Sequence, residues 1–303
     1  MPQPLRIATI NTNGVRAAYR KGMAAWLDAR AVDILAIQEV RASTEDLQGL
    51  LGPDWDILHD AATAKGRAGV AIASRTRPAA VADGSDGVSG SPDGGARRGA
   101  SIHRVALGDD DFDSAGRWLE ADYEVGGKIV TVVSAYVHSG EVDTPKQVEK
   151  YRFLDAMTAR LPELAAHSEY AVILGDLNVG HRELDIRNWK GNVKRAGFLP
   201  RERAYFDRFF GPVGETVTGV DGSTGPGLGW VDVGRQQSGE IDGPYTWWSW
   251  RGQAFDNDTG WRLDYHLATP ALAATVVDYT VDRAAAWDQR WSDHTPVIVD
   301  YAL

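Results

Sequence analysis

Short apolar runs rich in β-branched residues recur along the chain, and longer amphipathic stretches separate them. Runs of this length are typical of buried strands, whereas the amphipathic stretches are typical of helices that cover a sheet. The alternation therefore predicts an α/β fold. The predicted strands span residues 5–10, 33–37, 69–73, 129–135, 170–174, 261–268, 274–281 and 296–301.

The clearest helical pattern covers residues 146–164. Its apolar side chains recur every three or four positions, which places them on one face of a helix. Pro145 suits the first turn, where its missing N–H costs nothing. The apolar residues of this face are Val148, Tyr151, Leu154, Met157, Leu161 and Leu164.

The chain has 303 residues, of which 43% are apolar, so it can form one large α/β domain or two small ones. Residues 83–100 contain six glycines and residues 211–229 contain seven. We expect neither stretch to bury enough apolar surface to become well ordered. Both could be linkers, but the strand-like segments around them keep the same composition. We therefore predict one single domain over residues 1–303.

Composition narrows the function classes. The absence of cysteine excludes disulfides, thiolate metal sites and cysteine nucleophiles. No apolar run approaches the roughly 18 residues of a membrane span, and the N-terminus lacks a signal-peptide pattern, so we expect a cytoplasmic protein. The net charge of −10 does not suggest a nucleic-acid binder, yet residues 181–210 carry eight Lys or Arg against four acids. That strip can neutralise a phosphate backbone, although an ordinary solvated surface explains it equally well.

Polar residues follow several predicted strands where a loop should begin. Glu39 follows the strand at 33–37, and Asp176 and Asn178 follow the strand at 170–174. In layered α/β folds, sites are assembled at such strand ends. A carboxylate can bind Mg²⁺ or Mn²⁺ or take a proton from water, and an amide can donate to a phosphoryl oxygen. Each residue alone is also compatible with an ordinary turn.

Further polar residues extend this series. Asn11 and Tyr136 follow predicted strands, Asp264 lies in a later strand, and Asp293-His294 precedes the last one. A histidine can act as a base or contact a phosphate near neutral pH, and a nearby aspartate can orient its imidazole. Singly, these residues could be turn, packing or capping residues. Together, a set rich in carboxylates and amides matches metal-assisted attack of water on a phosphodiester.

The motifs around these residues resemble the exonuclease III group of apurinic/apyrimidinic (AP) endonucleases, within the endonuclease/exonuclease/phosphatase superfamily. The resemblance extends from Ile7 to Tyr301. Residues 184–203 and 245–250 further resemble the DNA-repair branch of that superfamily. The motifs that carry the resemblance are Asn11-Thr12-Asn13-Gly14-Val15-Arg16-Ala17, Gln38-Glu39, Gly175-Asp176-Leu177-Asn178-Val179, Trp261-Arg262-Leu263-Asp264-Tyr265 and Ser292-Asp293-His294.

The resemblance implies a four-layer α/β sandwich, in which two mixed β-sheets pack face to face with helices outside. It implies that Asp176 orients or deprotonates the attacking water, and that Asn178 and Tyr136 steady the phosphate. His294, paired with Asp264, would contact the scissile phosphoryl group or act as the base. Whether the site binds one metal ion or two stays open. The implied metal ligands are Asn11, Glu39, Asp176, Asn178, Asp293 and His294.

The same resemblance implies a DNA-binding face. Seven of the eleven tryptophans lie beyond residue 225, and some of them could stack on a base or fill an abasic gap. We expect most of them in the core, and interpret Trp248 and Trp287 as the two that face the substrate. The other implied DNA contacts are Arg16, Arg187, Asn188, Lys190 and Asn192.

The sequence thus predicts a monomeric DNA-repair nuclease that requires Mg²⁺ or Mn²⁺. It would hydrolyse the phosphodiester 5′ to abasic sites, and would remove nucleotides or blocking groups from 3′ ends of duplex DNA. Two alternatives stay open: a superfamily phosphatase acting on a lipid or small phosphoester, and a catalytically silent DNA-binding protein. The repair-like residues 184–203 argue against the first, and the intact polar motifs argue against the second.

Overall fold

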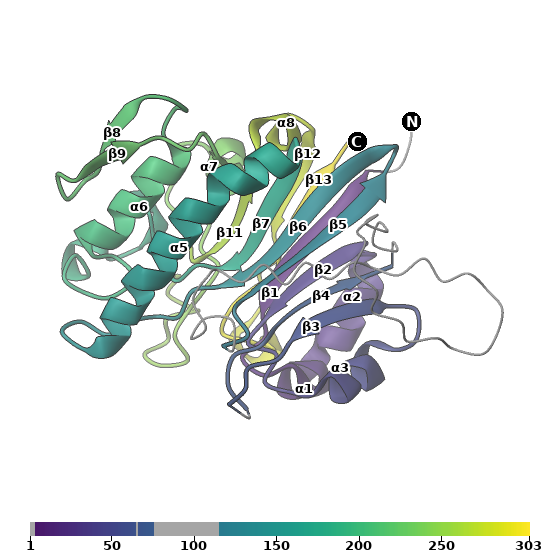
Figure 1. Cartoon of the computed structure of the whole chain (residues 1–303). Coiled ribbons are helices and arrows are strands. Elements are labelled where there is room, and N and C mark those ends of the chain that lie inside the picture. Colours follow the sequence, from purple (N-terminus) through teal and green to yellow (C-terminus); the bar gives the residue numbers. More distant parts are fainter. Residues whose placement is uncertain (1–3, 65, 76–114) are drawn as a thin grey trace.

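Two β-sheets pack face to face, and helices cover their outer faces (Figure 1). This computed structural model describes residues 4–64, 66–75 and 115–303. The strands are β1 (Leu5–Asn11), β2 (Ile34–Gln38), β3 (Asp56–Asp60), β4 (Val70–Ser74), β5 (Trp118–Val125), β6 (Lys128–Tyr136), β7 (Tyr170–Asp176), β8 (Thr216–Thr218), β9 (Thr224–Pro226), β10 (Val231–Asp232), β11 (Asp264–Ala268), β12 (Val276–Val281) and β13 (Val297–Tyr301).

The α-helices connect and cover these strands. They are α1 (Val15–Ala18), α2 (Ala24–Arg30), α3 (Thr44–Leu51), α5 (Pro145–His167), α6 (Pro200–Phe210), α7 (Val233–Ser238) and α8 (Pro270–Ala273). Short helical turns are η1 (Tyr19–Met23), η2 (Glu183–Asp185), η3 (Trp189–Gly191) and η4 (Trp287–Gln289). Within the described ranges, none of the helices has both the length and the apolar surface needed to cross a membrane.

The sheets are mixed, as predicted. One has the strand order β12-β13-β1-β2-β4-β3 and the other β10-β11-β7-β6-β5. The pairs β1–β2 and β6–β7 are parallel, and the neighbouring pairs around them are antiparallel. Helices α1 to α3 lie outside the first sheet, and α5 and α6 lie outside the second (Figure 1). The predicted four-layer α/β sandwich is therefore confirmed.

Each layer boundary has its own apolar core, because every covered sheet face must be shielded from water. Ile7 and Ile34 of one sheet meet Val132 and Leu174 of the other in the central core. Helix α5 packs Leu154 and its neighbours onto the outside of the second sheet. The predicted helix at 146–164 is confirmed and continues to His167.

Eight predicted strands are present, and most of their bounds agree within two residues. The segment at 261–268 is shorter than predicted, because β11 begins only at Asp264. Strands β3, β5 and β10 are absent from the prediction, and in β5 the buried Glu120 and Asp122 interrupt the apolar pattern. Arg160 on α5 pairs with Glu120 at 2.9 Å, and His167 lies 3.0 Å from Asp122, so these charges are tolerated under the helix.

The expectation of poor order for residues 211–229 is wrong. Strands β8 and β9 form an antiparallel pair there, and the Gly229 N–H donates to the Gly211 carbonyl at 2.8 Å. A Cβ on Gly227 would lie 2.2 Å from the Pro212 carbonyl oxygen, so this glycine permits a close backbone approach. The other glycine-rich stretch, residues 83–100, lies outside the described residues.

A short chain of hydrogen bonds ties the two sheets together behind their polar strand ends. Thr9 donates to Gln38 Oε1 at 3.1 Å, and Gln38 Nε2 donates to Ser134 Oγ at 3.0 Å. All three side chains are fully buried. Because Glu39 follows Gln38 directly and Tyr136 lies two residues after Ser134, this link fixes one sheet edge against the other.

Candidate active site

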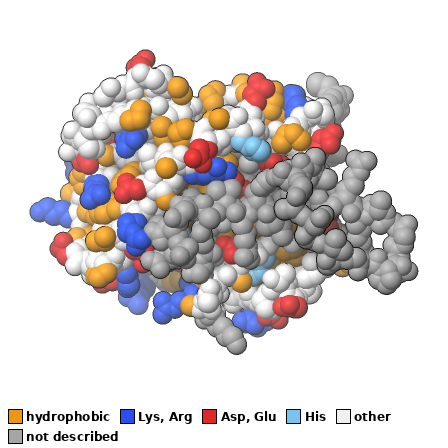
Figure 2. Space-filling model, in the orientation of Figure 1, with side chains coloured by type: hydrophobic (Ala, Val, Ile, Leu, Met, Phe, Trp, Pro, Cys, Tyr) orange, Lys and Arg blue, Asp and Glu red, His pale blue; other side chains and the backbone are white. Residues whose placement is uncertain are grey.

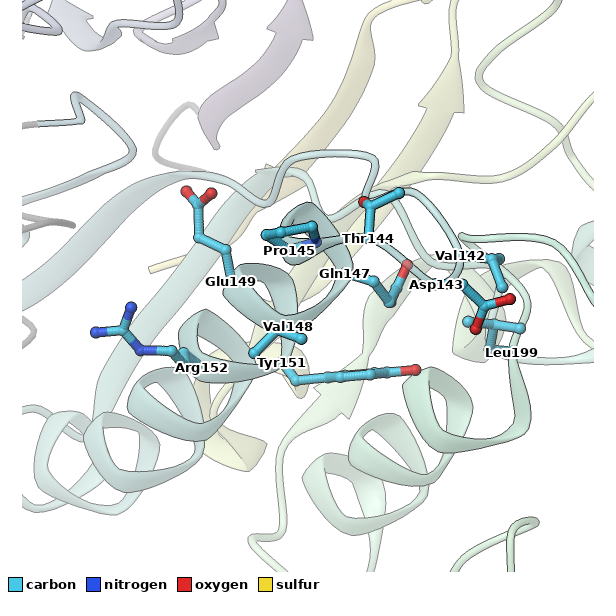
Figure 3. Close-up of a pocket in the computed structure, with 10 residues that line it drawn as sticks. All are labelled: Val142, Asp143, Thr144, Pro145, Gln147, Val148, Glu149, Tyr151, Arg152 and Leu199. Atoms are coloured by element: carbon cyan, nitrogen blue, oxygen red, sulfur yellow. The ribbon is translucent and has the colours of Figure 1, made fainter.

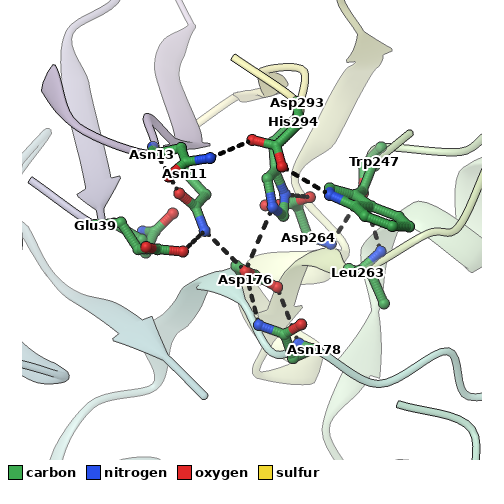
Figure 4. Close-up of polar contacts among 12 residues, drawn as sticks. Asn11, Asn13, Glu39, Asp176, Asn178, Trp247, Leu263, Asp264, Asp293 and His294 are labelled. Atoms are coloured by element: carbon green, nitrogen blue, oxygen red, sulfur yellow. Dashed lines mark hydrogen bonds and ion pairs between the residues drawn. The ribbon is translucent and has the colours of Figure 1, made fainter. Parts of the chain in front are cut away.

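The polar strand ends of both sheets meet at one place (Figure 4). In the second sheet, Asp176 pairs in register with Tyr136 on one side and Asp264 on the other. In the first sheet, Asn11 pairs with Gln38. Asn11 Nδ2 then reaches across and donates to Asp176 Oδ2 at 2.9 Å. The shared register thus brings residues from distant parts of the chain to one point.

Unusual backbone geometry aims several side chains toward this point. Asn13, Glu39, Arg41 and Asn178 have φ angles of 48°, 48°, 50° and 49°, in the left-handed region that side chains other than glycine rarely adopt. Gly175 precedes Asp176 with φ 144°, and a Cβ there would lie 1.9 Å from the Ala135 carbonyl oxygen. Such conformations persist where the surrounding structure enforces them, and they cluster at functional sites.

Asp176 lies at the centre of the site. Its Oδ1 accepts the Asn178 backbone N–H at 3.0 Å, and its Oδ2 accepts the side-chain amides of Asn11 and Asn178, each at 2.9 Å. Burial raises the pKa of the Asp176 carboxyl, although the nearby His294 charge opposes the shift. A carboxylate of raised pKa is suited to accept a proton near neutral pH.

His294 lies between two carboxylates. Its Nδ1 is 2.8 Å from Asp264 Oδ2, and its Nε2 is 3.6 Å from Asp176 Oδ2. Burial opposes a charge on the imidazole, but Asp264 and Asp176 outweigh it and raise the pKa of His294. Thr246 Oγ1 accepts the backbone N–H groups of Leu263 and Asp264, which fixes the Asp264 carboxyl beside the ring. The two carboxylates therefore favour the charged imidazolium form.

Glu39 and Asp293 supply two further carboxylates to the site. Glu39 Oε1 accepts Asn11 Nδ2 at 2.9 Å, and its Oε2 pairs with Arg41. Asp293 accepts Asn13 Nδ2 at 3.0 Å and Trp247 Nε1 at 3.1 Å. Burial would raise the pKa of Asp293, but the His294 charge and these two donors lower it. Asp293 is therefore a stable anion at neutral pH.

The donor set fits a hard divalent cation, which prefers carboxylate and amide oxygens. Asp176, Asp264 and His294 can each bring a ligand atom within 4.8 Å of the others. However, both ring nitrogens of His294 face carboxylates, which argues for the oxygens as ligands. Asp264 Oδ1 is buried and has no hydrogen-bond partner among the described residues. Glu39 and Asp293 supply further anionic oxygens.

The two predicted asparagine ligands, Asn11 and Asn178, make hydrogen bonds within the cluster. Asn11 Oδ1 accepts the Asn13 backbone N–H at 2.9 Å, so the amino group of Asn11 faces Glu39 and Asp176. Asn178 Nδ2 donates to Asp176 and to the Val137 carbonyl. In this arrangement both amides orient carboxylates, and neither presents its oxygen to the carboxylate cluster.

A cavity of about 380 Å³ is lined on its polar side by Glu39, Asp176, Asn178, Asp293 and His294. Tyr136 contributes to its polar side, where burial and the charge of Glu39 raise the pKa of the phenol and keep it a neutral donor. The opposite wall is largely apolar and comprises Ala196, Gly197, Trp247, Trp261 and Leu263. The site therefore combines a charged floor with an aromatic wall.

The two tryptophans predicted to face the substrate, Trp248 and Trp287, do not line this cavity. Trp248 is only 1% exposed, and its Nε1 donates to Asp258, so the prediction that it faces the substrate is wrong. Trp287 is exposed but packs against Trp250 outside the cavity. The aromatic wall comes from Trp247 and Trp261, whose ring centroids are 6.2 Å apart. Periodicity could not reveal this, because adjacent tryptophans in an extended segment face opposite sides.

A larger cavity lies beside the start of α5 (Figure 3). Its volume is about 920 Å³. Val142, Val148 and Tyr151 supply apolar surface there, and Asp143, Glu149 and Arg152 supply charge. None of the predicted site residues lines this cavity, so its size alone does not mark it as the active site.

The predicted DNA-contact residues lie outside the carboxylate cluster. Arg187, Asn188 and Lys190 are exposed in the segment after β7. Arg16 pairs with Asp46 and Arg187 pairs with Asp242, each at 3.0 Å in exposed ion pairs that are weak enough to exchange for a phosphate. On the part of the surface that described residues form in Figure 2, Lys and Arg alternate with Asp and Glu. That view offers no single basic patch.

Comparisons with known proteins extend over nearly the whole chain. The model of the endonuclease/exonuclease/phosphatase family matches residues 8–294. The chain is 28% identical to an exodeoxyribonuclease of Bacillus subtilis, over 97% of this chain and 98% of that protein. The structure of an AP endonuclease from Archaeoglobus fulgidus is similar with a TM-score of 0.73 and 25% identity, covering 99% and 100% of the two chains. The 3′ phosphatase NExo from Neisseria, bound to product DNA hairpin, is similar with a TM-score of 0.74, 26% identity and the same coverage.

Proposed function

The chain belongs to the endonuclease/exonuclease/phosphatase family, and from that premise we propose that it is a metal-dependent phosphodiesterase that acts on DNA. We propose that it cuts the phosphodiester 5′ to abasic sites and removes nucleotides or blocking groups from 3′ ends. The observation that carries this proposal is the cavity in which Glu39, Asp176 and His294 face an aromatic wall of Trp247 and Trp261. The likeness to exonuclease III and AP endonucleases supports the same substrate class.

Asp176 orients the attacking water and accepts its proton in this proposal. Its carboxylate is held from two sides by Asn11 and Asn178, so it cannot rotate away from the substrate. The raised pKa of Asp176 makes it a stronger base than an exposed aspartate. A base fixed in this way can act at neutral pH without a cysteine or serine nucleophile.

His294 and Tyr136 steady the phosphate. The imidazolium offers a charged N–H from Nε2, while Asp264 holds the ring through Nδ1. Tyr136 stays protonated and donates its phenolic O–H. As charge accumulates on the phosphoryl oxygens during attack, these donors stabilise it more strongly than they stabilise the starting phosphodiester.

Glu39 and Asp293 would hold Mg²⁺ or Mn²⁺, and Asn11 orients Glu39. Asp176 and the Asp264 oxygen that has no partner among the described residues belong to the same cluster. When bound, the cation supplies positive charge that offsets the charge on the leaving 3′ oxygen. Arg41 pairs with Glu39 and keeps its carboxylate directed into the site.

The aromatic wall supports abasic specificity. Trp247, Trp261 and Leu263 leave a shallow apolar space beside the carboxylates, within a cavity of about 380 Å³. A sugar without its base can pack against such a wall, whereas a stacked base pair would have to be unstacked at a cost of a few kcal/mol. Arg16, Arg187, Asn188, Lys190 and Asn192, which are the predicted DNA contacts, would hold the duplex on either side.

The test is a cleavage assay on abasic, nicked and 3′-phosphorylated duplexes, with Mg²⁺ or Mn²⁺ and with EDTA. We expect cutting that EDTA abolishes and that Asp176→Asn and His294→Ala each reduce strongly. Turnover of an inositol phosphate or sphingomyelin without DNA cutting would instead favour a small-phosphoester phosphatase. Tight DNA binding without any cutting would favour a catalytically silent binding protein.

A further inference from the structure

A fully buried ion pair lies directly behind the candidate site. Lys150 Nζ of α5 is 2.7 Å from Glu202 Oε1 of α6, and both side chains are 0% exposed. Lys150 falls on the apolar face of α5, with Leu154, Met157, Leu161 and Leu164 three or four residues apart after it. A charged residue on this face needs an explanation, because an apolar residue of similar size is often at least as stabilising as a buried ion pair.

The contacts of Lys150 point toward the cavity. Its Nζ donates to the Asn178 carbonyl at 2.8 Å and to the Ser139 carbonyl at 3.2 Å. Ser139 and Asn178 both line the cavity, in the segments that follow β6 and β7. A single ammonium group therefore holds together the two segments that carry the phosphate side of the site.

Glu202 makes the corresponding contacts on the aromatic side. Its Oε2 accepts the backbone N–H of Gly197 at 2.7 Å and of Leu199 at 3.0 Å. Gly197 has φ 91°, and a Cβ there would lie 3.0 Å from the ring of Trp261. Gly197 thus packs closely against the aromatic wall, and the Glu202 carboxylate fixes its position.

We propose that Lys150 and Glu202 are positioning residues that set the separation between Asn178 and the Gly197–Trp261 wall of the cavity. The inference rests on the proposed function. The pair touches backbone groups of residues that line the cavity from both sides, and neither of its side chains lines the cavity itself. The charges of the pair lie behind the site, where they hold the two segments in place. Other residues contact the reacting atoms.

The experiment compares steady-state cleavage of an abasic-site duplex by the parent and by Lys150→Met. Since a displacement of about 1 Å in a substrate-positioning group can lower the rate on the order of 10²-fold, we expect kcat to fall by about 10- to 100-fold. KM should stay close to the parent value, because Lys150 does not line the cavity. The Mn²⁺ concentration for half-maximal activity should also be unchanged.

Arg160→Met is the matched control. It removes the ion pair of Arg160 with Glu120 from the same helix, ten residues further along, or about 15 Å away. We expect this variant to lose thermal stability comparably and to keep the parent kcat. An equal fall of kcat in both variants would mean that only loss of stability is measured, and would overturn the inference.

The double variant Lys150→Met/Glu202→Gln separates positioning from folding, and it carries the test if the single variant does not fold. Removing both charges should recover the Tm lost in Lys150→Met, since no uncompensated charge stays buried. The kcat should remain low, because the Asn178 carbonyl has lost its donor. If kcat returns together with Tm, the pair is merely structural and the inference is wrong.

Failure of the proposed function can be distinguished from failure of the positioning role. A parent chain that cuts no DNA would contradict that function, and the inference would then be judged by NMR. The side-chain amide signals of Asn178 should shift in Lys150→Met and stay in place in Arg160→Met. Unshifted Asn178 signals in Lys150→Met would overturn the positioning role whatever the activity of the parent.

Discussion

Two buried charge clusters meet where strand β11 begins. They are built from similar residues, but the pKa values of their carboxyl groups are shifted in opposite directions. Arg262 belongs to the first cluster, where its Nε donates to Asp185 at 2.7 Å and its Nη2 to Asp232 at 2.6 Å. Arg235 adds a second donor to Asp185 at 2.5 Å. Asp264, two residues after Arg262, belongs to the active-site cluster and keeps one oxygen without a partner among the described residues.

The pKa shifts separate the two clusters. Burial acts to raise the pKa of Asp185, but the arginines outweigh it and lower this pKa to about 2. For Asp176, burial prevails over the charge of His294 and raises the pKa to about 7. A cluster whose charges are fully paired holds the fold, whereas one with an excess of carboxylate is ready to accept a proton or a cation. The degree of pairing, more than the residue types, distinguishes structure from chemistry here.

The largest expected effect on activity comes from neutralising Asp176 in the active-site cluster. Asp176→Asn removes the proposed base while it keeps the shape and the hydrogen-bonding size of the side chain. We expect kcat on an abasic duplex to fall by about 10³- to 10⁴-fold. The Tm should stay the same or rise, because a carboxylate whose ionisation is opposed by burial has been removed. Full activity in this variant would remove Asp176 from the mechanism.

Neutralising the other cluster should have the reverse result. Arg262→Met leaves Asp185 and Asp232 buried without their principal partner, so the free energy of unfolding should fall by about 3–5 kcal/mol. Urea unfolding measures this change. The activity per folded molecule should remain near that of the parent at low temperature, and a large loss of kcat in fully folded protein would show that the two clusters are coupled.

Much of this arrangement could be predicted from the sequence, because strands and the polar residues after them leave a local pattern. This pattern predicts Glu39, Asp176 and His294 as members of one site, and all three line one cavity in the structure. The partners of Arg262 could not be, since Asp185 and Asp232 lie 77 and 30 residues away along the chain. Their pairing depends on tertiary packing, which periodicity does not encode.

The same limit explains the remaining differences. The sequence predicts Trp248 and Trp287 at the substrate face and does not single out Trp247, because the side on which Trp247 faces depends on its bridge to Trp261. The β8–β9 pair was taken for a poorly ordered loop because glycine composition does not distinguish flexibility from close backbone approach. The extent of the domain over residues 1–303, the monomeric state and the cytoplasmic location remain predictions.

Substitutions of Asp293 and His294, within the active-site cluster, should have smaller effects than Asp176→Asn. Asp293→Asn should raise the Mn²⁺ concentration for half-maximal activity by about 10- to 100-fold, as loss of an ion-holding contact does. His294→Gln should lower kcat about 10²-fold and leave the metal requirement unchanged. Metal titrations of both variants make the distinction, and identical titration curves would contradict the division of roles.

The most gradual effect, spread over several pH units, is a difference in how the two clusters respond to pH. The folded state binds the Asp176 proton more tightly than the unfolded state does, so this group contributes less stability as pH rises from about 4 to about 7. The free energy of unfolding of Asp176→Asn should therefore increase relative to that of the parent across that range, by at most about 1.4 kcal/mol per pH unit. Asp185 has the opposite sign: its contribution is present above about pH 4 and is lost as pH falls toward 2. Urea unfolding of parent and variant between pH 4 and pH 7, roughly the window set by these groups, measures the first effect.

The most direct test of the central claim is the chemistry of the cut itself. An abasic-site duplex is incubated with the parent chain and Mg²⁺ in ¹⁸O-labelled water, and the product ends are identified by mass spectrometry. The account predicts a 3′-hydroxyl on the upstream fragment, a labelled 5′ phosphate on the abasic residue, and no cutting with EDTA. Cutting on the 3′ side of the abasic site, or without incorporation of solvent oxygen or need for metal, would contradict it.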